Sequence, residues 1–227
     1  MIDSKVIKNK AKMLGADLCG IATVGRFVDA PKGFHPRDIF PQCKSVISVA
    51  SKFPLSTLQG KSNVPYTMVR NMMVEKMDRI SFLLSSELEA EGIISLPIPC
   101  ADPYEYYDRE KNQGKGILSL KHTAELAGLG VIGKNTLLIN NKFGNMIWLS
   151  AILISVELKS DPLASYKGCL DKCTLCIDKC PQKALDGKTL DQKLCRVLSV
   201  SETKLGGWIL SCNLCRKICP NHIGLKD

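Results

Sequence analysis

Eight cysteines between residues 169 and 219 constrain this chain more than any other feature of its sequence. They form two runs with a lone cysteine between them: Cys169, Cys173, Cys176 and Cys180; Cys195; then Cys212, Cys215 and Cys219. Each run ends in Cys-x3-Cys-Pro, at Pro181 and at Pro220. This spacing is typical of segments that bind two [4Fe–4S] clusters, in which the last cysteine of one run ligates the other cluster. The C-terminal part of the chain is therefore expected to wrap around two iron–sulfur cages.

The crossed pattern assigns all eight ligands. Cluster A is predicted to take Cys169, Cys173, Cys176 and Cys219, and cluster B to take Cys180, Cys195, Cys212 and Cys215. Cys195 completes cluster B because the second run supplies only three cysteines. One irregularity is that three residues separate Cys169 from Cys173, whereas the usual run has two. The prolines suit a chain that turns away from a cluster, because proline fixes φ and donates no N–H.

Zinc and disulfides are the alternatives for these cysteines. Zinc sites favour paired Cys-x2-Cys knuckles, and disulfides need an oxidising compartment. Residues 1–5 include charged side chains and no apolar stretch, unlike a secretory signal. The longest apolar run, residues 146–156, is shorter than the roughly 20 residues of a membrane helix. We therefore expect a cytoplasmic protein with no membrane partner, in an anaerobic or well-reduced setting.

The net charge of +9 raises the question of a nucleic-acid partner. That number counts every cysteine as neutral, and two oxidised clusters with eight thiolates would bring it to about +5. The lysines are scattered along the chain, which is more typical of a solvated surface than of a nucleic-acid footprint. No signature of a nucleic-acid-binding fold stands out.

At 227 residues the chain suits a larger domain followed by a small one, which we place at residues 1–162 and 163–227. Apolar periodicity predicts helices at residues 4–14, 66–91 and 119–127, and buried strands at residues 18–22, 45–51 and 93–98. These alternating elements indicate an α/β or α+β layer. Ser4 is the predicted N-cap of the first helix. The predicted inward face of the long helix consists of Met68, Met72, Met73, Met77, Ile80, Leu83, Leu84 and Leu88.

Two further segments carry structural expectations. Residues 99–116 are polar, contain several tyrosines and show no obvious element, and loops of this length are usually functional lids or disordered. Residues 136–139 are expected to pair with residues 146–156 as a hairpin, because Asn141 and Gly144 between them allow a tight turn.

A glycine-rich turn lies between the helix at 119–127 and this hairpin. Gly128-x-Gly130-x-x-Gly133 matches the dinucleotide-binding pattern, yet it follows a helix and precedes a strand, whereas a Rossmann fingerprint needs the reverse order. A dinucleotide site is therefore excluded. The glycines would allow a ligand close to the backbone, and the N–H groups with Lys134 would suit an anionic group. A tight helix-to-strand turn is the alternative.

Residues 127–138, AGLGVIGKNTLL, resemble the AGLGWIGKNTLL core of epoxyqueuosine reductases. Residues 35–47 are similar to that family's RPEDLLPGAKSVI stretch, and the cysteine runs extend the resemblance over nearly the whole chain. The chain departs from the family at two positions. Val131 stands where the family has tryptophan, and Gly114 stands where the family has the aspartate of a D-[ST]-A-P segment. The chain also stops at Asp227, so we expect a short subgroup without the family's C-terminal helical extension.

The resemblance implies a fold and a chemistry. Like the related reductive dehalogenases, the chain would have an α+β fold: a nitroreductase-derived, cobalamin-domain-like α/β layer followed by a two-[4Fe–4S] ferredoxin-like module. Electrons would pass through the clusters to cobalamin in the N-terminal domain and reduce a small or nucleoside-like substrate. The expected cofactor-binding residues are Gly128, Gly130, Gly133, Lys134, Asn135 and Thr136. The expected proton donors are His122, Lys121 and Tyr106, because histidine and tyrosine are ordinary general acids when positioned.

Two other functions fit the same residues. The chain could be a dicluster electron-transfer protein or a redox activator of a partner corrinoid protein or metalloenzyme, with no substrate of its own. It could instead modify tRNA, although the missing aspartate makes tRNA an unlikely partner. Each reductive role requires an electron donor such as reduced ferredoxin or flavodoxin.

Overall fold

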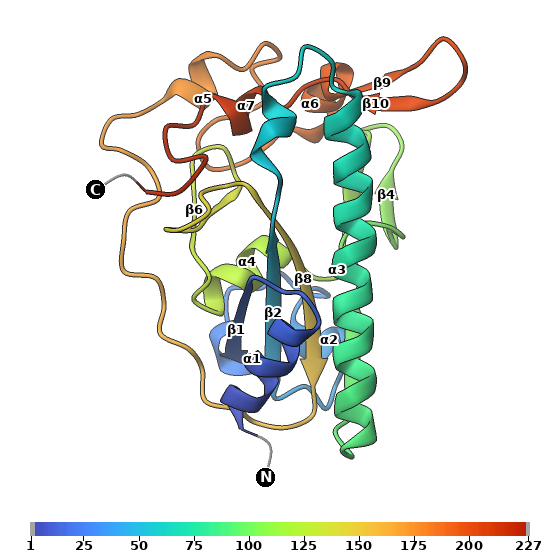
Figure 1. The fold of residues 1–227 in the computed structure, drawn as a ribbon, viewed down its shortest axis with the longest axis vertical. Helices are drawn as coiled ribbons and strands as arrows, with labels where there is room; N and C mark the ends of the chain where they lie inside the picture. Colours follow the sequence, from blue (N-terminus) through green and yellow to red (C-terminus); the bar gives the residue numbers. More distant parts are fainter. Residues whose placement is uncertain (1–2, 226–227) are drawn as a thin grey trace.

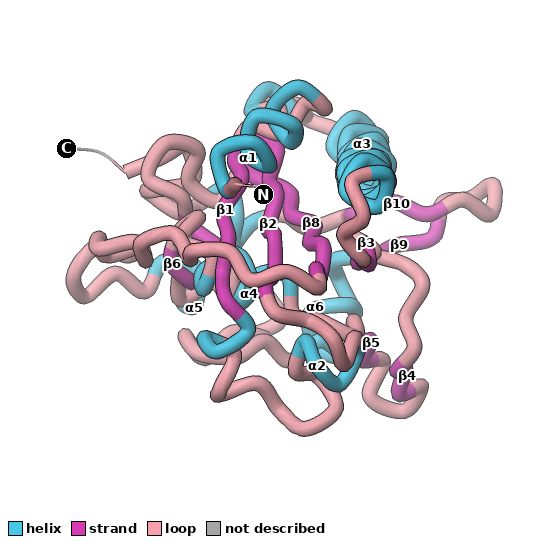
Figure 2. Tube along the Cα trace, turned by 90° about the horizontal axis from the view of Figure 1, so that it is seen from below, coloured by secondary structure: helices cyan, strands magenta, loops and turns pink. Residues whose placement is uncertain are grey.

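A four-stranded antiparallel sheet forms the centre of the N-terminal part of the computed structural model, which describes residues 3–225. The strand order is β1 (Leu18–Thr23), β2 (Ser45–Lys52), β8 (Ile147–Ile154) and β3 (Ser95–Ile98). Strands β2 and β8 pair along their whole length, from Ser45 opposite Ile154 to Lys52 opposite Ile147. Both are buried almost throughout because helices cover both faces of the sheet (Figures 1 and 2).

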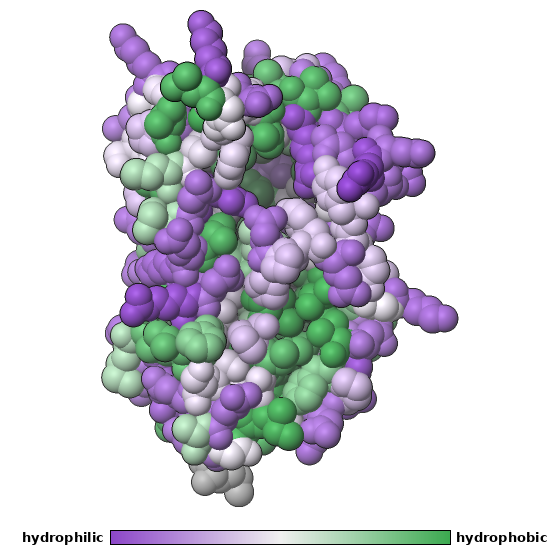
Figure 3. All heavy atoms as spheres, turned by 90° about the vertical axis from the view of Figure 1, so that its right-hand side faces the viewer, coloured by the Kyte–Doolittle hydropathy of each residue, from purple (hydrophilic) through white to green (hydrophobic). Residues whose placement is uncertain are grey.

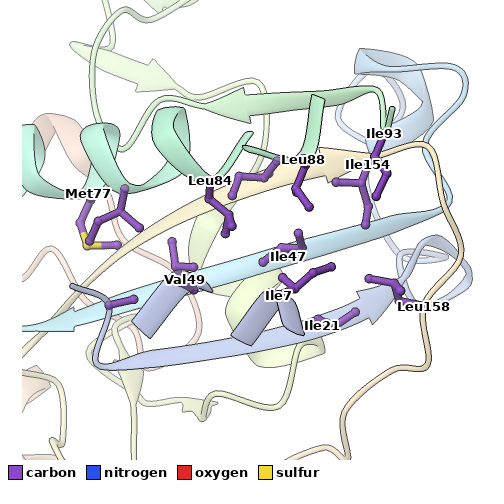
Figure 4. Packing of buried hydrophobic residues seen from close by; sticks show 14 residues of the cluster. Ile7, Ile21, Ile47, Val49, Met77, Leu84, Leu88, Ile93, Ile154 and Leu158 are labelled. Carbon is purple, nitrogen blue, oxygen red and sulfur yellow. The ribbon is translucent and has the colours of Figure 1, made fainter. Parts of the chain in front are cut away.

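Two helices cover one face of the sheet. They are α1 (Ser4–Met13) and α3 (Val64–Ala90), which contribute Ile7 and Leu84 to a cluster that includes Ile47 (Figure 4). Since strand side chains alternate between faces, Val46 points to the opposite side. There α4 (Leu120–Leu126) packs against β1, β2 and β8. The result is a three-layer arrangement of helices, sheet and helix.

Short elements connect these layers. They are η1 (Val24–Arg26), α2 (Pro36–Ile39), η2 (Leu55–Leu58), the ribbon of β4 (Tyr106–Asp108) with β5 (Gln113–Lys115), and the ribbon of β6 (Val131–Ile132) with β7 (Leu138–Ile139).

The C-terminal elements gather at one end of the molecule, beside the start of α3 (Figure 1). They are α5 (Leu175–Asp178), α6 (Gln192–Ser199), β9 (Val200–Glu202), β10 (Trp208–Leu210) and α7 (Leu214–Lys217). The Thr67 hydroxyl on α3 accepts a hydrogen bond from the Leu210 N–H at 2.9 Å, which ties β10 to the long helix. Among residues 3–225, no helix combines the length and the apolar character that a bilayer crossing requires.

The mixed α/β layer is confirmed, and the predicted helices and strands of residues 1–98 are present with shifts of a few residues at their ends. The predicted N-cap was wrong: Asp3 caps α1 by accepting a hydrogen bond from the Lys5 N–H at 2.7 Å, and Ser4 lies inside the helix. Met68 and Met72 were also wrongly placed, because they are 57% and 53% exposed. The buried residues of α3 begin with Tyr66 and Thr67 and continue from Met73 to Leu88 at helical spacing, and neither methionine lies on this face.

Two expectations for the middle of the chain were wrong. Residues 99–116 contain the β4–β5 ribbon rather than only a loop. Strand β7 pairs with β6, and not with β8, which lies between β2 and β3. The apolar run of β8 is buried on both faces, and such a strand is stable only in the middle of a covered sheet. The residues after β7 instead form a tight turn in which Asn140 and Gly144 exchange backbone hydrogen bonds.

Candidate iron–sulfur site

The eight predicted ligands lie together in the C-terminal elements and the loops between them (Figure 1). Cys176 is on α5, Cys195 on α6 and Cys215 on α7, while the other five lie in the flanking loops. All are free thiols. Within residues 3–225, no group of three or more histidine, cysteine, aspartate or glutamate side chains is arranged to hold a single metal ion.

Mutual charge effects separate the thiols into two groups of four. Burial raises the pKa of Cys219, and the charges of Cys169, Cys176 and Cys173 raise it further. Burial also raises the pKa of Cys195, with added effects from Cys212 and Cys180. The structure therefore brings Cys219 to the first run, although some 40 residues separate them in sequence, and brings Cys180 to the second run. These are the groups assigned above to clusters A and B, and their occupancy by iron stays a prediction.

The two groups are neighbours. Burial raises the pKa of Cys215 to about 11, and its other influences include Cys176 of the first group as well as Cys195 and Cys212 of its own. The contact arises because α5 packs against α7. Electrons can pass between cofactors held by adjacent cysteine groups.

The four thiols of group A line one small cavity of about 10 Å³, which Lys134 and Asn135 also border. The donor chemistry fits an iron–sulfur cluster, because such clusters are held by thiolates. Backbone donors are also in place: the Lys134 N–H lies 3.3 Å from Cys169 Sγ, and the Ala184 N–H lies 3.4 Å from Cys180 Sγ. Hydrogen bonds to the sulfurs tune the reduction potential of such clusters.

The glycine-rich turn holds the cysteine segment. Lys134 Nζ donates to the carbonyl oxygen of Cys173 at 2.8 Å, and Asn135 Nδ2 donates to that of Cys215 at 3.2 Å. A Cβ at Gly128 would lie 2.1 Å from the carbonyl oxygen of Pro162, and one at Gly130 would lie 2.5 Å from that of Ile139. Glycine is required at both positions because two backbone segments of the protein pack closely there. A tight turn between α4 and β6 is therefore enough to explain these two glycines.

The remaining residues of the turn also contact other parts of the protein. Thr136 is buried with φ at 60°, an unusual conformation for a β-branched residue, and its carbonyl oxygen accepts a hydrogen bond from Lys121 Nζ at 3.2 Å. Gly133 lies against Ile139, where a Cβ would come within 2.5 Å of its Cδ1. The six residues expected to bind cobalamin thus make contacts within the protein, and their role in binding a cofactor stays a prediction.

The three expected proton donors lie in two places. Lys121 and His122 are on α4, where His122 Nδ1 lies 2.6 Å from Ser119 Oγ. Burial lowers the pKa of both residues, and the charge of Lys121 lowers that of His122 further. Tyr106 is on β4, 43% exposed, with its ring 5.3 Å from that of Phe34. Neither the cavity of group A nor the depression beside it is lined by any of the three.

The β4–β5 ribbon is attached to the helix that carries Cys195. The side chain of Gln192 forms two hydrogen bonds with the backbone of Gly114, at 3.1 and 3.0 Å. Arg196 donates to Asn112 Oδ1 at 3.2 Å and lies over the ring of Tyr107. Sequence reasoning predicted either a functional lid or a disordered loop for this segment and missed its partners on α6, since nothing in the sequence links segments so far apart.

A buried arginine is the other residue that the sequence analysis missed. Arg216 follows Cys215, is 8% exposed, and lies 5.5 Å from the Trp148 ring centroid and 6.0 Å from that of Phe53. It donates to the carbonyl oxygen of Asn145. Among residues 3–225, it forms no ion pair with a carboxylate. Its position between two cysteines of the second run was the one available signal.

No family model matches the chain. The epoxyqueuosine reductase of Gloeobacter violaceus is 29% identical over 227 aligned residues, which cover 94% of this chain and 67% of that protein. The chain is similar to epoxyqueuosine reductases over nearly its whole length. The first curated relatives of the family match over 31% and 35% of their own length, so the chain spans only part of them.

Solved structures share the fold at lower sequence identity. An epoxyqueuosine reductase solved with a tRNA stem loop has a TM-score of 0.64 at 20% identity, covering 96% of this chain and 64% of that one. A reductive dehalogenase described as B12-dependent has a TM-score of 0.73 at 17% identity, covering 95% of this chain and 31% of that one. At these identities the two structures support the fold alone.

Proposed function

We propose that this chain is an iron–sulfur oxidoreductase that conducts electrons through two [4Fe–4S] clusters toward an acceptor at the N-terminal domain. The observation that supports this most is the gathering of eight free thiols into two adjacent groups of four. The two groups correspond to the crossed ligands of a two-cluster segment. When bound, the clusters would supply single-electron transfer, and the chain's own residues would hold and insulate them.

The direction of electron flow follows from what surrounds each group. Cys169 of group A also lines a depression that is open to solvent. Cys195 of group B lies on α6, whose Gln192 holds the β4–β5 ribbon. We therefore assign electron uptake to cluster A and delivery to cluster B. Figure 3 shows a hollow in the upper half of the face on which α3, β4 and the β9–β10 ribbon lie, where an acceptor could approach.

Two acceptors compete. The first is cobalamin bound by this chain, supported by the relation to a B12-dependent dehalogenase. The second is a corrinoid or metal centre of a partner protein. It is supported by the glycine-rich turn, because Lys134 and Asn135 of this turn already form hydrogen bonds with the cysteine segment. A related enzyme binds a tRNA stem loop, so tRNA is a substrate to test rather than one to dismiss.

The clusters are tested by anaerobic reconstitution. We expect about eight iron atoms per chain and an EPR signal from reduced clusters. A Cys195→Ala variant should lose about half of the iron. The control is Cys19→Ala, because Cys19 lies on β1 and outside both groups. Equal iron in all three proteins, or one equivalent of zinc in place of iron, would refute the two-cluster proposal.

The acceptor is tested with the same holo protein. Hydroxocobalamin is added to the reduced protein, and the mixture is passed through an anaerobic gel-filtration column. Cobalamin that elutes with the protein supports a site in this chain. Cobalamin that elutes separately, from protein with full iron, assigns the acceptor to a partner.

A further inference from the structure

A shallow depression lies directly beside group A. It is lined by residues 131–134 of the glycine-rich turn, by residues 166–172, and by Gly187 and Lys188, and it has a volume of about 540 Å³ and is open to solvent. Cys169 lines both this depression and the cavity of group A. A molecule seated in the depression would therefore be separated from cluster A by little more than one ligand side chain.

The depression is positively charged. Its lining includes four lysines, Lys134, Lys167, Lys172 and Lys188, and one carboxylate, Asp171, which gives a net charge of four minus one, or +3. Lys167 pairs with Asp171 at 2.9 Å. Among the described residues, Lys172 and Lys188 are exposed and form no ion pair, so their charges face solvent.

The local backbone keeps this surface close to the cysteines. Lys172 has φ at 59°, in a turn closed by a hydrogen bond from the Cys173 N–H to the Leu170 carbonyl oxygen at 3.1 Å. A Cβ at Gly168 would lie 2.6 Å from a methyl group of Val131, so the two sides of the depression pack against each other. The positive charges thus belong to the segment that presents Cys169 and Cys173.

We propose that this depression is the docking site of an acidic one-electron carrier protein of the ferredoxin or flavodoxin class. The proposal rests on the function proposed above, for which it supplies the electron donor. In the transfer, the reduced carrier loses one electron and the oxidised cluster A gains one, with no bond made or broken. Opposite charges on the two surfaces would steer the carrier to the depression and raise the association rate.

A protein carrier fits this surface better than a nucleic acid. Single-stranded RNA is bound largely by stacking its bases on aromatic side chains. Tyr166 is the aromatic residue of the lining, and its hydroxyl is held between the Asn141 N–H at 3.0 Å and the Ile139 carbonyl oxygen at 3.2 Å. The lining also includes Cys169, a predicted ligand of cluster A. This position would shorten the path for an incoming electron, whereas RNA binding does not require it.

The test compares the rate of cluster reduction in two charge-reversal variants of the holo protein. Lys172→Glu/Lys188→Glu reverses charges in the depression. Lys12→Glu/Lys32→Glu is the matched control, with two exposed lysines outside the cysteine segment. Stopped-flow absorbance follows reduction by a reduced acidic [2Fe–2S] ferredoxin at low and high salt. Photoreduced deazariboflavin, which carries no net charge, reports whether the clusters accept electrons at all.

We expect the depression variant to lose at least tenfold in second-order rate constant with ferredoxin at low salt. The loss should shrink at high salt because salt screens exposed charges. Reduction by deazariboflavin should be unchanged in both variants. Equal ferredoxin rates in the wild type and the depression variant, or an equal loss in the control, would overturn the docking site.

Two further outcomes are informative. If the depression variant loses affinity for tRNA, measured by fluorescence anisotropy, while its ferredoxin rate is unchanged, the surface binds nucleic acid and the carrier proposal is wrong. If the wild-type clusters are not reduced by deazariboflavin, the proposed function fails independently of the docking site.

Discussion

Arg216 is expected to raise the reduction potential of the cluster beside it. It is a buried cation next in sequence to Cys215, and its charge lowers the pKa of that thiol against the larger effect of burial. The same charge favours the reduced cluster, which is one unit more negative than the oxidised one. Replacing Arg216 with methionine removes the charge and keeps an apolar side chain against Trp148 and Phe53.

The size of the effect follows from Coulomb's law. A unit charge about 10 Å from the cluster, at an effective dielectric constant of about 20, contributes about 1.7 kcal/mol. For a one-electron couple this corresponds to a fall of about 70 mV in the potential of Arg216→Met. The variant also leaves the carbonyl oxygen of Asn145 without its donor, which costs about 1–3 kcal/mol of folding stability.

The assay is an EPR-monitored redox titration under anaerobic conditions. Arg216→Lys is the control, because it keeps the charge and should keep most of the potential. Iron content and the urea midpoint separate an electrostatic effect from partial unfolding. An unchanged or higher potential in Arg216→Met protein with full iron would refute the reasoning.

Three further predictions concern the packing around the site and the core. Gly130→Ala places a Cβ 2.5 Å from the Ile139 carbonyl oxygen and should lower the free energy of unfolding by about 1–3 kcal/mol in urea titrations, whereas an unchanged midpoint would show that the turn can relax. Leu84→Ala removes a fully buried side chain and should cost about 2–5 kcal/mol by the same measurement, and a smaller loss would show that the core collapses around it. The pKa of His122 is lowered by burial and then by Lys121, so the unfolded chain binds more protons than the folded one below about pH 6.5, and the folded state loses stability as the pH falls. His122→Gln should remove that loss, so its unfolding free energy should rise relative to the wild type between about pH 7 and about pH 5.5, and parallel pH profiles would contradict the assigned cause.

Local patterns predicted the elements of the first half of the chain well. Strand β2 is a mainly apolar run and α1 has an apolar stripe, and these signals need only neighbouring residues. The same reasoning failed for Met68 and Met72, which are exposed. Their spacing in the sequence fits an apolar face of α3 that is wider than the part of the helix in contact with the sheet. It also failed for β8, since an apolar strand does not reveal which strands lie beside it.

The candidate site was predictable in its residue types and less so in its surroundings. The spacing of the cysteines, with their trailing prolines, was enough to assign eight ligands to two groups. For the glycine-rich turn the sequence left two interpretations, a cofactor-binding turn and a tight helix-to-strand turn. The structure shows Lys134 and Asn135 bound to the backbone of the cysteine segment, a contact that spans 39 and 80 residues of sequence.

The sequence by itself predicted the eight candidate ligands, the buried strands and the first helix of this protein, because each signal lies in residues within a few positions of one another. The tertiary structure alone decided that Arg216 is buried between Phe53 and Trp148. It also decided that the lysines scattered in sequence form one charged depression beside Cys169. These features depend on segments far apart in the chain, and only the packing of the folded protein brings such segments together.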